Sequence, residues 1–322
     1  MNRKKFLSNL TFAGIGISSI GITACGNQSK KNTTSSSSKV PFFKISLAQW
    51  SINKMIKNGD ISPYDFARLG KKWGFEGLEF VNTLYDDVMK ASNKSLALKK
   101  FIVQNNQLAN QYDIKNLLIM IDEEGDLSSE YKNTRLLAIE NHKPWVEAAS
   151  EMGCHSIRVN LNGNVKKVES WKTLSKESLS TLSDYASTYN INIIVENHGG
   201  YSSNADLLIG VINDVNKNNC GTLPDFGNFC ISGQWGAGNV GCIEEYDRYL
   251  GVKKLMSKAF AVSAKSYDFS LEGDEITIDY DKMLSIVKEA NYSGYIGVEY
   301  EGSILTEEAG TIATRDLLIK YA

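Results

Sequence analysis

The chain has 322 residues, of which 42% are hydrophobic and 22% charged, and its formal net charge is -2 at pH 7. Nucleic-acid binding usually requires a marked excess of positive charge. We therefore expect no nucleic-acid partner. The length allows one large domain or two smaller ones.

The first 25 residues have the pattern of an export signal. Met1–Lys5 is basic, Phe6–Ile22 is apolar and short for a membrane span, and small residues lead into Cys25. The pattern resembles a bacterial lipoprotein signal, in which this cysteine is lipidated and becomes the mature N-terminus. We expect an exported lipoprotein that a lipid anchor holds at a membrane, on the periplasmic side. The sequence leaves the export route open, because Lys4 replaces the second arginine of a twin-arginine signal.

Residues 26–40 are polar and rich in serine, as in a flexible linker. Residues 41–322 then form a single predicted domain. Cys230 and Cys242 lie close in sequence and could form a disulfide in an exported protein, while free thiols are an open alternative. No CxxC pair or Cys/His cluster indicates a structural zinc site.

Strand-like and helix-like segments alternate from residue 41 to the end. Ser62 followed by Pro63 marks one helix start. Eight strand–helix units predict an α/β fold, a (β/α)8 TIM barrel. A doubly wound sheet is the alternative, but no GxGxxG turn follows the first strand. Strands are expected at 43–50, 77–81, 115–121, 156–160, 191–196, 221–225, 259–265 and 295–301. Helices are expected at 62–73, 96–112, 130–152, 176–189, 204–216, 242–255, 280–290 and 306–321, with a long loop at 227–241.

Polar residues gather at the C-terminal ends of these strands, where TIM barrels carry their catalytic groups. Residues two apart on a strand share a face, so Glu196 and His198 project together while Asn197 points away. Such pairs recur on other strands. The polar strand-end residues are Gln49, Trp50, Glu79, Arg158, Asn160, Glu196, His198, Asp225, Ser263, Lys265, Glu299 and Glu301.

Three of these residues, Glu196, Asp225 and Glu299, are carboxylates that would repel one another without a cation between them. Mn²⁺, Mg²⁺, Co²⁺ or Zn²⁺ suits such ligands. Glu196 and Glu299 lie on nearly opposite strands and could remove and return a proton on the two faces of a substrate carbon. Lys265 is placed to stabilise an enediolate oxygen.

The stretches VENHGG, LPDFGN, AVSAK and GYIGVEYEG resemble the sugar phosphate isomerase/epimerase superfamily of xylose-isomerase-like TIM barrels, over about residues 43–322. The resemblance implies metal ligands at Glu196, Asp225 and Glu299. Ser263 stands at the position of a family histidine ligand, and serine is a weak ligand. His198 matches a family contact to the substrate, and Asn228 stands at the position of another family histidine. The full expected substrate-binding set is His198, Asn228, Arg158, Asn160, Gln49 and Trp50.

We therefore expect a sugar isomerase or epimerase that abstracts a proton next to a carbonyl group of an unphosphorylated sugar or keto-sugar. A lyase or hydratase that uses the same site is one alternative. A carbohydrate-binding lipoprotein without activity is another. An endonuclease is disfavoured, because the three histidines are too few for a multi-zinc site. The sequence indicates neither the metal nor the oligomeric state.

Overall fold

The computed structural model describes residues 41–162, 165–233 and 241–322. The expected signal segment and the linker, residues 1–40, lie outside the described residues. Within the described ranges, no helix is both long and apolar enough to cross a membrane.

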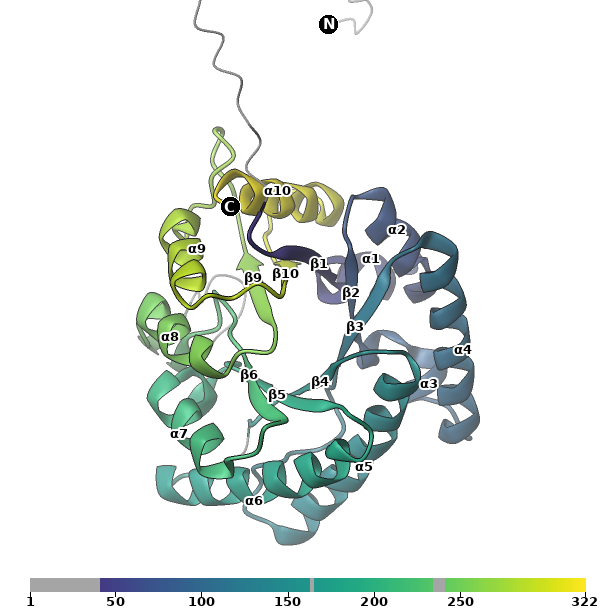
Figure 1. Ribbon diagram of the computed structural model, residues 1–322, viewed down its shortest axis with the longest axis vertical. Helices are drawn as coiled ribbons and strands as arrows, with labels where there is room; N and C mark the ends of the chain where they lie inside the picture. The colour runs from purple at the N-terminus through teal and green to yellow at the C-terminus, as the bar shows by residue number, and fades with distance from the viewer. Residues whose placement is uncertain (1–40, 163–164, 234–240) are drawn as a thin grey trace, which may run out of the picture. The chain divides into compact units, whose positions relative to one another are not determined.

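Eight parallel strands form one curled sheet, with helices around its outside (Figure 1). The first and last strands of the sequence, β1 and β10, lie side by side. This arrangement confirms the predicted TIM-barrel-like fold. In spatial order the strands are β6 (Cys220–Leu223), β5 (Asn192–Glu196), β4 (Ser156–Val159), β3 (Lys115–Met120), β2 (Gly77–Val81), β1 (Lys44–Ala48), β10 (Tyr295–Tyr300) and β9 (Val262–Ser266).

Helices connect successive strands and cover the outer face of the sheet (Figure 1). The α-helices of the described residues are α1 (Asn53–Lys57), α2 (Phe66–Lys72), α3 (Asp86–Met89), α4 (Lys94–Tyr112), α5 (Lys132–Glu151), α6 (Val168–Ser187), α7 (Ala205–Val215), α8 (Arg248–Leu255), α9 (Tyr280–Glu289) and α10 (Glu307–Lys320). The 3-10 helices are η1 (Gln49–Ile52), η2 (Pro63–Asp65), η3 (Asn82–Leu84), η4 (Gly200–Ser203) and η6 (Met256–Lys258).

The strands are buried on both faces, which explains their runs of β-branched residues. On β5, Ile193, Ile194 and Val195 are all fully buried. A polar side chain on such a strand therefore has no water to solvate it. Each one must find a partner inside the barrel.

The two edge strands, β6 and β9, meet through two isolated parallel bridges instead of a continuous ladder. The bridges join Thr222 to Ala259 and Asp225 to Ser263. Asp225 and Ser263, both expected in the site, thus also join the two edges of the sheet.

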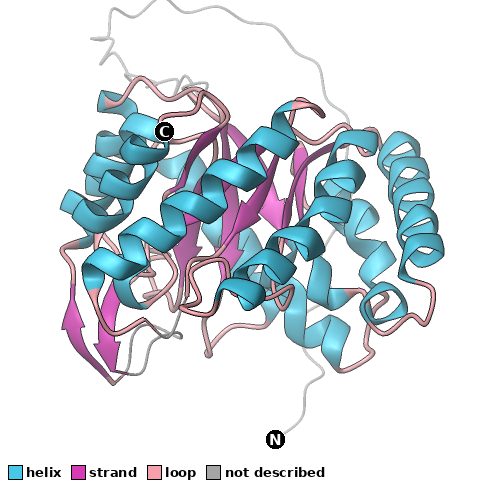
Figure 2. Ribbon diagram, turned by 90° about the horizontal axis from the view of Figure 1, so that it is seen from below, coloured by secondary structure: helices cyan, strands magenta, loops and turns pink. Residues whose placement is uncertain are grey.

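A two-stranded antiparallel sheet, β7 (Cys230–Gly233) and β8 (Cys242–Glu245), stands apart from the barrel strands (Figure 2). The prediction of a helix over all of 242–255 was therefore wrong. The helix begins only after Asp247, whose side chain accepts a hydrogen bond from the Leu250 backbone. Cys230 and Cys242 form a disulfide across the hairpin, while Cys154 and Cys220 are free and buried.

The first strand is also shorter than expected, because η1 begins directly after Ala48. Gln49 and Trp50 therefore lie on a 3-10 helix. The helix start at Ser62 is confirmed, since Ser62 and Asp65 form a reciprocal capping box.

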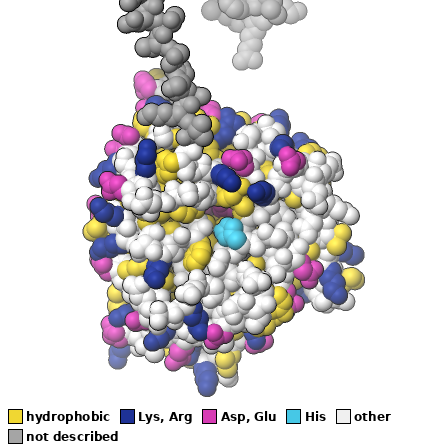
Figure 3. Space-filling view, in the orientation of Figure 1, with side chains coloured by type: hydrophobic (Ala, Val, Ile, Leu, Met, Phe, Trp, Pro, Cys, Tyr) yellow, Lys and Arg dark blue, Asp and Glu magenta, His cyan; other side chains and the backbone are white. Residues whose placement is uncertain are grey.

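On the face drawn in Figure 3, Lys and Arg side chains are interspersed with Asp and Glu side chains.

Candidate active site

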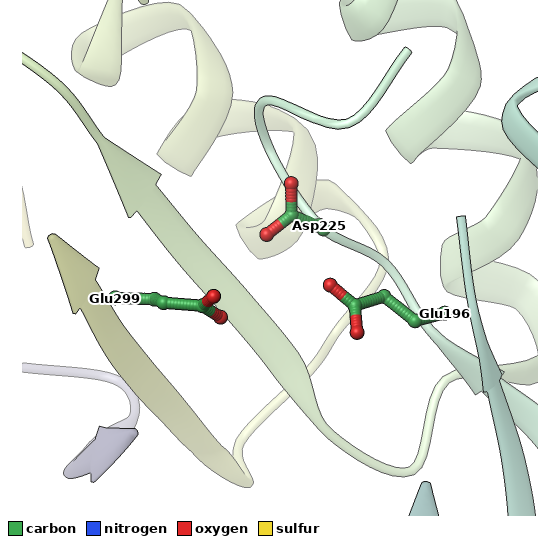
Figure 4. A group of neighbouring side chains, drawn as sticks. All are labelled: Glu196, Asp225 and Glu299. Atoms are coloured by element: carbon green, nitrogen blue, oxygen red, sulfur yellow. The ribbon is translucent and has the colours of Figure 1, made fainter. Parts of the chain in front are cut away.

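The carboxylates of Glu196, Asp225 and Glu299 converge at the C-terminal end of the barrel strands (Figure 4). One oxygen from each lies within 4.8 Å of the others, and all three residues are buried. Glu196 ends β5, Glu299 lies near the end of β10, and Asp225 follows β6. The structure thus brings together the three carboxylates that the sequence predicted as a group.

Asn197 fixes the position of Asp225. Its side-chain amide donates to the backbone oxygens of Asp225 (3.0 Å) and Asn228 (3.1 Å) and accepts from the Asp225 backbone nitrogen at 2.8 Å. The Asp225 carboxylate in turn accepts from the backbone nitrogens of Gly227 and Asn228. Asn197 thus holds the loop that carries Asp225.

Two buried cations compensate the carboxylates. Arg158 Nε lies 2.9 Å from Glu196 Oε2, and Lys265 Nζ lies 2.7 Å from Glu299 Oε1. Lys265 and Glu299 are direct partners in the β9–β10 register, so the ladder itself sets this pair. Lys265 also lies 3.9 Å from an oxygen of Asp225.

These surroundings give the two glutamates opposite protonation behaviour. Burial raises the pKa of Glu196 well above its usual range, and the Arg158 charge opposes this only in part. Burial would also raise the pKa of Glu299, but the Lys265 ammonium lowers it below its usual range. Burial raises the pKa of Asp225 to about 6. At neutral pH we therefore expect Glu196 to retain a proton more readily than Glu299 does.

Ser263 bridges two of the carboxylates. Its hydroxyl lies 2.6 Å from Asp225 Oδ2 and 3.0 Å from Glu299 Oε2. The cluster therefore offers only oxygen ligands: three carboxylates and one hydroxyl. That donor set fits a hard divalent cation such as Mg²⁺ or Mn²⁺ better than a soft one.

A cavity of about 450 Å³ opens beside the triad. This volume lies in the range of small-molecule sites. Glu299 lines the cavity directly, whereas Glu196, Asp225 and Lys265 lie deeper and are 2% exposed or less. The lining residues that carry charge are Lys54, Asp122, Glu123, Arg158, Glu299, Glu301 and Glu307.

Three of the predicted substrate-binding residues, Trp50, Arg158 and His198, line this cavity. The Trp50 indole donates to Glu301 Oε1 at 2.6 Å, and the Lys57 ammonium lies 4.1 Å from its ring centroid. Burial and the Arg158 charge lower the pKa of His198 to about 3. Its imidazole is therefore neutral at physiological pH.

The other three predicted substrate-binding residues do not line the cavity. Gln49 is fully buried, where its amide donates to the Tyr85 hydroxyl and accepts from the Val81 backbone nitrogen. Asn160 donates to Asp122 Oδ1 at 2.7 Å. Asn228 donates to Glu196 Oε1 at 3.1 Å. Gln49 thus links η1 to Val81 at the end of β2 and to Tyr85. Asn160 orients the carboxylate of Asp122, and Asn228 orients that of Glu196.

Asp122 is a site residue that the sequence analysis missed. It follows β3, and its carboxylate accepts from Arg158 Nη1 at 2.7 Å. Arg158 thus lies between Asp122 and Glu196. The same rule that selected the other strand-end residues would have found Asp122, because it directly follows the strand expected at 115–121.

Glu79 lies inside the barrel as an unusual buried acid. The Ser46 hydroxyl donates to its Oε1 at 2.6 Å, and its Oε2 has no hydrogen-bond partner among the described residues. A Cβ at Gly297 would lie 2.4 Å from this Oε2, so the glycine makes room for the carboxyl group. Burial raises the pKa of Glu79 to about 8.

Comparison with known families and with curated sequences adds two findings. Residues 67–321 match the family described as "Xylose isomerase-like TIM barrel". No curated protein sequence matches the chain.

Many solved structures share the fold at low sequence identity. A D-tagatose 3-epimerase-like protein is 17% identical, with a TM-score of 0.62 over 87% of this chain and 97% of that one. A 3-keto-D-glucoside 4-epimerase from E. coli is 13% identical, with a TM-score of 0.64 over 86% and 98%. The IolI protein with a bound zinc atom is 19% identical, with a TM-score of 0.60 over 87% and 99%.

The first prediction concerns Glu79 and pH. The folded protein holds the Glu79 proton up to about pH 8, whereas the unfolded chain loses it near pH 4.5. Between pH 4.5 and pH 8 the folded state therefore binds one proton more than the unfolded chain does. The free energy of unfolding consequently falls as the pH rises through this range. As the pH rises, the free energy of unfolding of Glu79→Gln should fall less steeply than that of the wild type. The two slopes should differ by about 1 kcal/mol per pH unit.

Urea unfolding between pH 5 and pH 9 measures this difference. Glu76→Gln changes an exposed glutamate three residues away and serves as the control. Parallel stability curves for Glu79→Gln and the wild type would show that Glu79 is ionised in the fold.

The second prediction concerns the metal. Protein stripped with a chelator and then given Mn²⁺ or Mg²⁺ at about 100 times its Kd should gain about 3 kcal/mol of stability. Asp225→Asn should lose most of this gain, while the surface change Glu289→Gln should keep it. Elemental analysis and thermal unfolding measure both effects. Equal metal content in Asp225→Asn and the wild type would place the ion elsewhere.

Proposed function

The chain belongs to the xylose isomerase-like TIM barrel family, and we propose that it is an isomerase or epimerase of a sugar or keto-sugar. It moves a proton at a carbon next to a carbonyl group. The observation that carries this proposal is the pair of buried glutamates with opposite pKa shifts, Glu299 at the cavity and Glu196 behind Arg158. Environments that push two pKa values apart are typical of acid–base pairs.

In this mechanism Glu299 is the base. Its carboxylate lines the cavity, and Lys265 favours its ionised form. It takes the proton from the carbon next to the carbonyl group, and an enediolate forms. Glu196, whose buried carboxyl favours the protonated form, returns a proton from the other side.

Positive charge stabilises the enediolate oxygen. Arg158 lines the cavity, and Lys265 lies directly behind Glu299. Glu196, Asp225 and Glu299 would hold a divalent cation, which would polarise the carbonyl oxygen. His198 is neutral at physiological pH and lines the same cavity, where it can exchange hydrogen bonds with a substrate hydroxyl.

The charges around the cavity favour an unphosphorylated substrate. Among the described residues that line it, carboxylates outnumber the cations Lys54 and Arg158. Arg158 already faces Asp122 and Glu196. A phosphate group would find little free positive charge here. The epimerase names of the similar structures also support a neutral carbohydrate.

A lyase or hydratase is the second candidate function, because the same proton abstraction begins an elimination. The similarity to a 3-keto-D-glucoside 4-epimerase supports testing a keto-glycoside for either outcome. The two reactions differ in what happens to the enediolate. Elimination expels a leaving group, while epimerisation returns the proton.

The third prediction tests the acid–base pair. D-tagatose, D-allulose and a 3-keto-D-glucoside are incubated in D₂O, and deuterium incorporation is followed by NMR. Epimerisation appears as deuterium at the reacting carbon, whereas elimination appears in the same spectra as an unsaturated product. Glu299→Gln should slow deuterium exchange, and Glu196→Gln should slow formation of the epimer, each by about 10²- to 10⁴-fold.

Glu289→Gln, which changes a surface glutamate beside Lys253, is the matched control and should exchange at the wild-type rate. Undiminished formation of the epimer in Glu196→Gln would remove Glu196 from the mechanism. Sugar binding by the wild type without any exchange would favour a carbohydrate-binding protein over an enzyme.

We also propose that the protein is exported and carries a lipid on Cys25, with residues 26–40 as a tether to the domain at 41–322. The pattern of residues 1–25 supports this. The disulfide between Cys230 and Cys242 supports an oxidising compartment.

The fourth prediction follows from this location. Mass spectrometry of the protein from membranes should find an acylated N-terminal cysteine and no residues 1–24. Cys25→Ser should leave the protein unacylated and in the soluble fraction. An intact Met1 on the membrane-bound wild type would instead indicate an uncleaved anchor.

A further inference from the structure

We propose that Glu123 is a substrate-binding residue of the cavity, which accepts hydrogen bonds from sugar hydroxyls, and that its strained backbone serves this purpose. This inference rests on the carbohydrate substrate proposed above. It assigns a role to a residue that the motifs of the sequence did not single out.

Glu123 lines the cavity together with Trp50, Thr83 and Arg158, and it is exposed there. Its neighbours in sequence have partners, since Asp122 pairs with Arg158 and Glu124 with Lys94. In the part of the chain that the structure describes, the Glu123 carboxylate has no hydrogen bond or ion pair of its own. Its acceptor oxygens therefore remain available to a ligand in the cavity.

The backbone of Glu123 is in the left-handed region, with φ of 61°. Glutamate rarely adopts this conformation, whereas asparagine and aspartate do so more readily. The other non-glycine residues with positive φ in the described ranges all follow a helix within three residues. They are Asp113, Asn190, Asn216 and Asn291. Glu123 alone among these five follows a strand.

Anchors on both sides of Glu123 impose this conformation. The Asn82 side chain donates to the Asp122 backbone oxygen and accepts from its backbone nitrogen, both at 2.9 Å. On the other side, the buried Glu124 carboxylate accepts from the Trp145 indole at 2.7 Å. Strain that surrounding contacts enforce is often found at binding sites.

The turn by itself does not explain a glutamate here. At Gly125, φ is 98° and a Cβ would lie 3.0 Å from Ala138 Cβ. Both the positive φ and the lack of space therefore explain the glycine at this position. Asparagine or glycine at position 123 would relieve the strain. A carboxylate on an exposed, strained backbone at a cavity wall is instead suited to accept hydrogen bonds from two sugar hydroxyls.

The fifth prediction separates binding from folding. Glu123→Asn and Glu123→Gly both remove the carboxylate and suit a positive φ. Their melting temperatures should equal or exceed that of the wild type, while the Kd for a bound sugar should rise about 10- to 100-fold. The probes are D-tagatose, D-allulose and a 3-keto-D-glucoside, measured by calorimetry. Asn216→Gly, a positive-φ position at the end of α7, is the control and should leave Kd unchanged.

Weaker binding with an undiminished melting temperature supports the proposal. Unchanged sugar binding in both Glu123 variants overturns it, and the proposed function then stands. A lower melting temperature in both variants, with or without weaker binding, also overturns it, because Glu123 is then structural. If the wild type binds none of the sugars, both the proposed function and the role of Glu123 fail. The deuterium exchange of the wild type tests the proposed function independently of Glu123.

Discussion

Three buried carboxylates that share one small space place the strongest demand on this structure. Glu196, Asp225 and Glu299 would repel one another in a region from which water is excluded. The protein supplies Arg158 beside Glu196 and Lys265 beside Glu299, and it directs two backbone N–H groups at Asp225. The three carboxylates outnumber the two cations and leave an excess of negative charge. This excess suits the binding of a divalent cation or the uptake of a proton from the substrate.

The same residues also support the fold. The bridge from Asp225 to Ser263 lies between the two edge strands of the sheet, so the site lies where β6 meets β9. Asn197 holds the Asp225 loop from the neighbouring strand. The site is therefore positioned mainly by strand ends and backbone hydrogen bonds, which favours the rigid placement that acid–base chemistry requires.

The cavity wall differs in chemistry from the buried triad behind it. Buried cations compensate the triad only in part, whereas the cavity wall adds carboxylates such as Asp122, Glu123 and Glu301 and the indole of Trp50. An acidic wall beside an aromatic ring suits hydroxyl-rich, uncharged ligands, because hydroxyl groups donate to carboxylates and C–H faces pack on rings. The proposed export would place the disulfide between β7 and β8 in an oxidising compartment.

The sequence by itself determined the architecture and the members of the triad. Buried parallel strands leave apolar runs that end in polar residues, and these strand ends indicated Glu196, Asp225 and Glu299. Local patterns also located the Ser62 helix start, and the family resemblance predicted the three carboxylates as metal ligands. These features depend on residues near one another in the chain.

Only the tertiary structure decided how these residues interact. Gln49 lies at a strand end like the true site residues, but the turn of η1 directs its amide to Tyr85 and Val81. The segment at 242–245 has helical spacing, yet it pairs with β7, an earlier segment of the chain. Burial raises the pKa of Glu196 against the opposing charge of Arg158, whereas Lys265 lowers the pKa of Glu299, and both cations come from other strands. The strain at Glu123 comes from anchors on η3, α4 and α5. Such effects depend on contacts between distant segments, and these become definite only when the barrel brings the segments together.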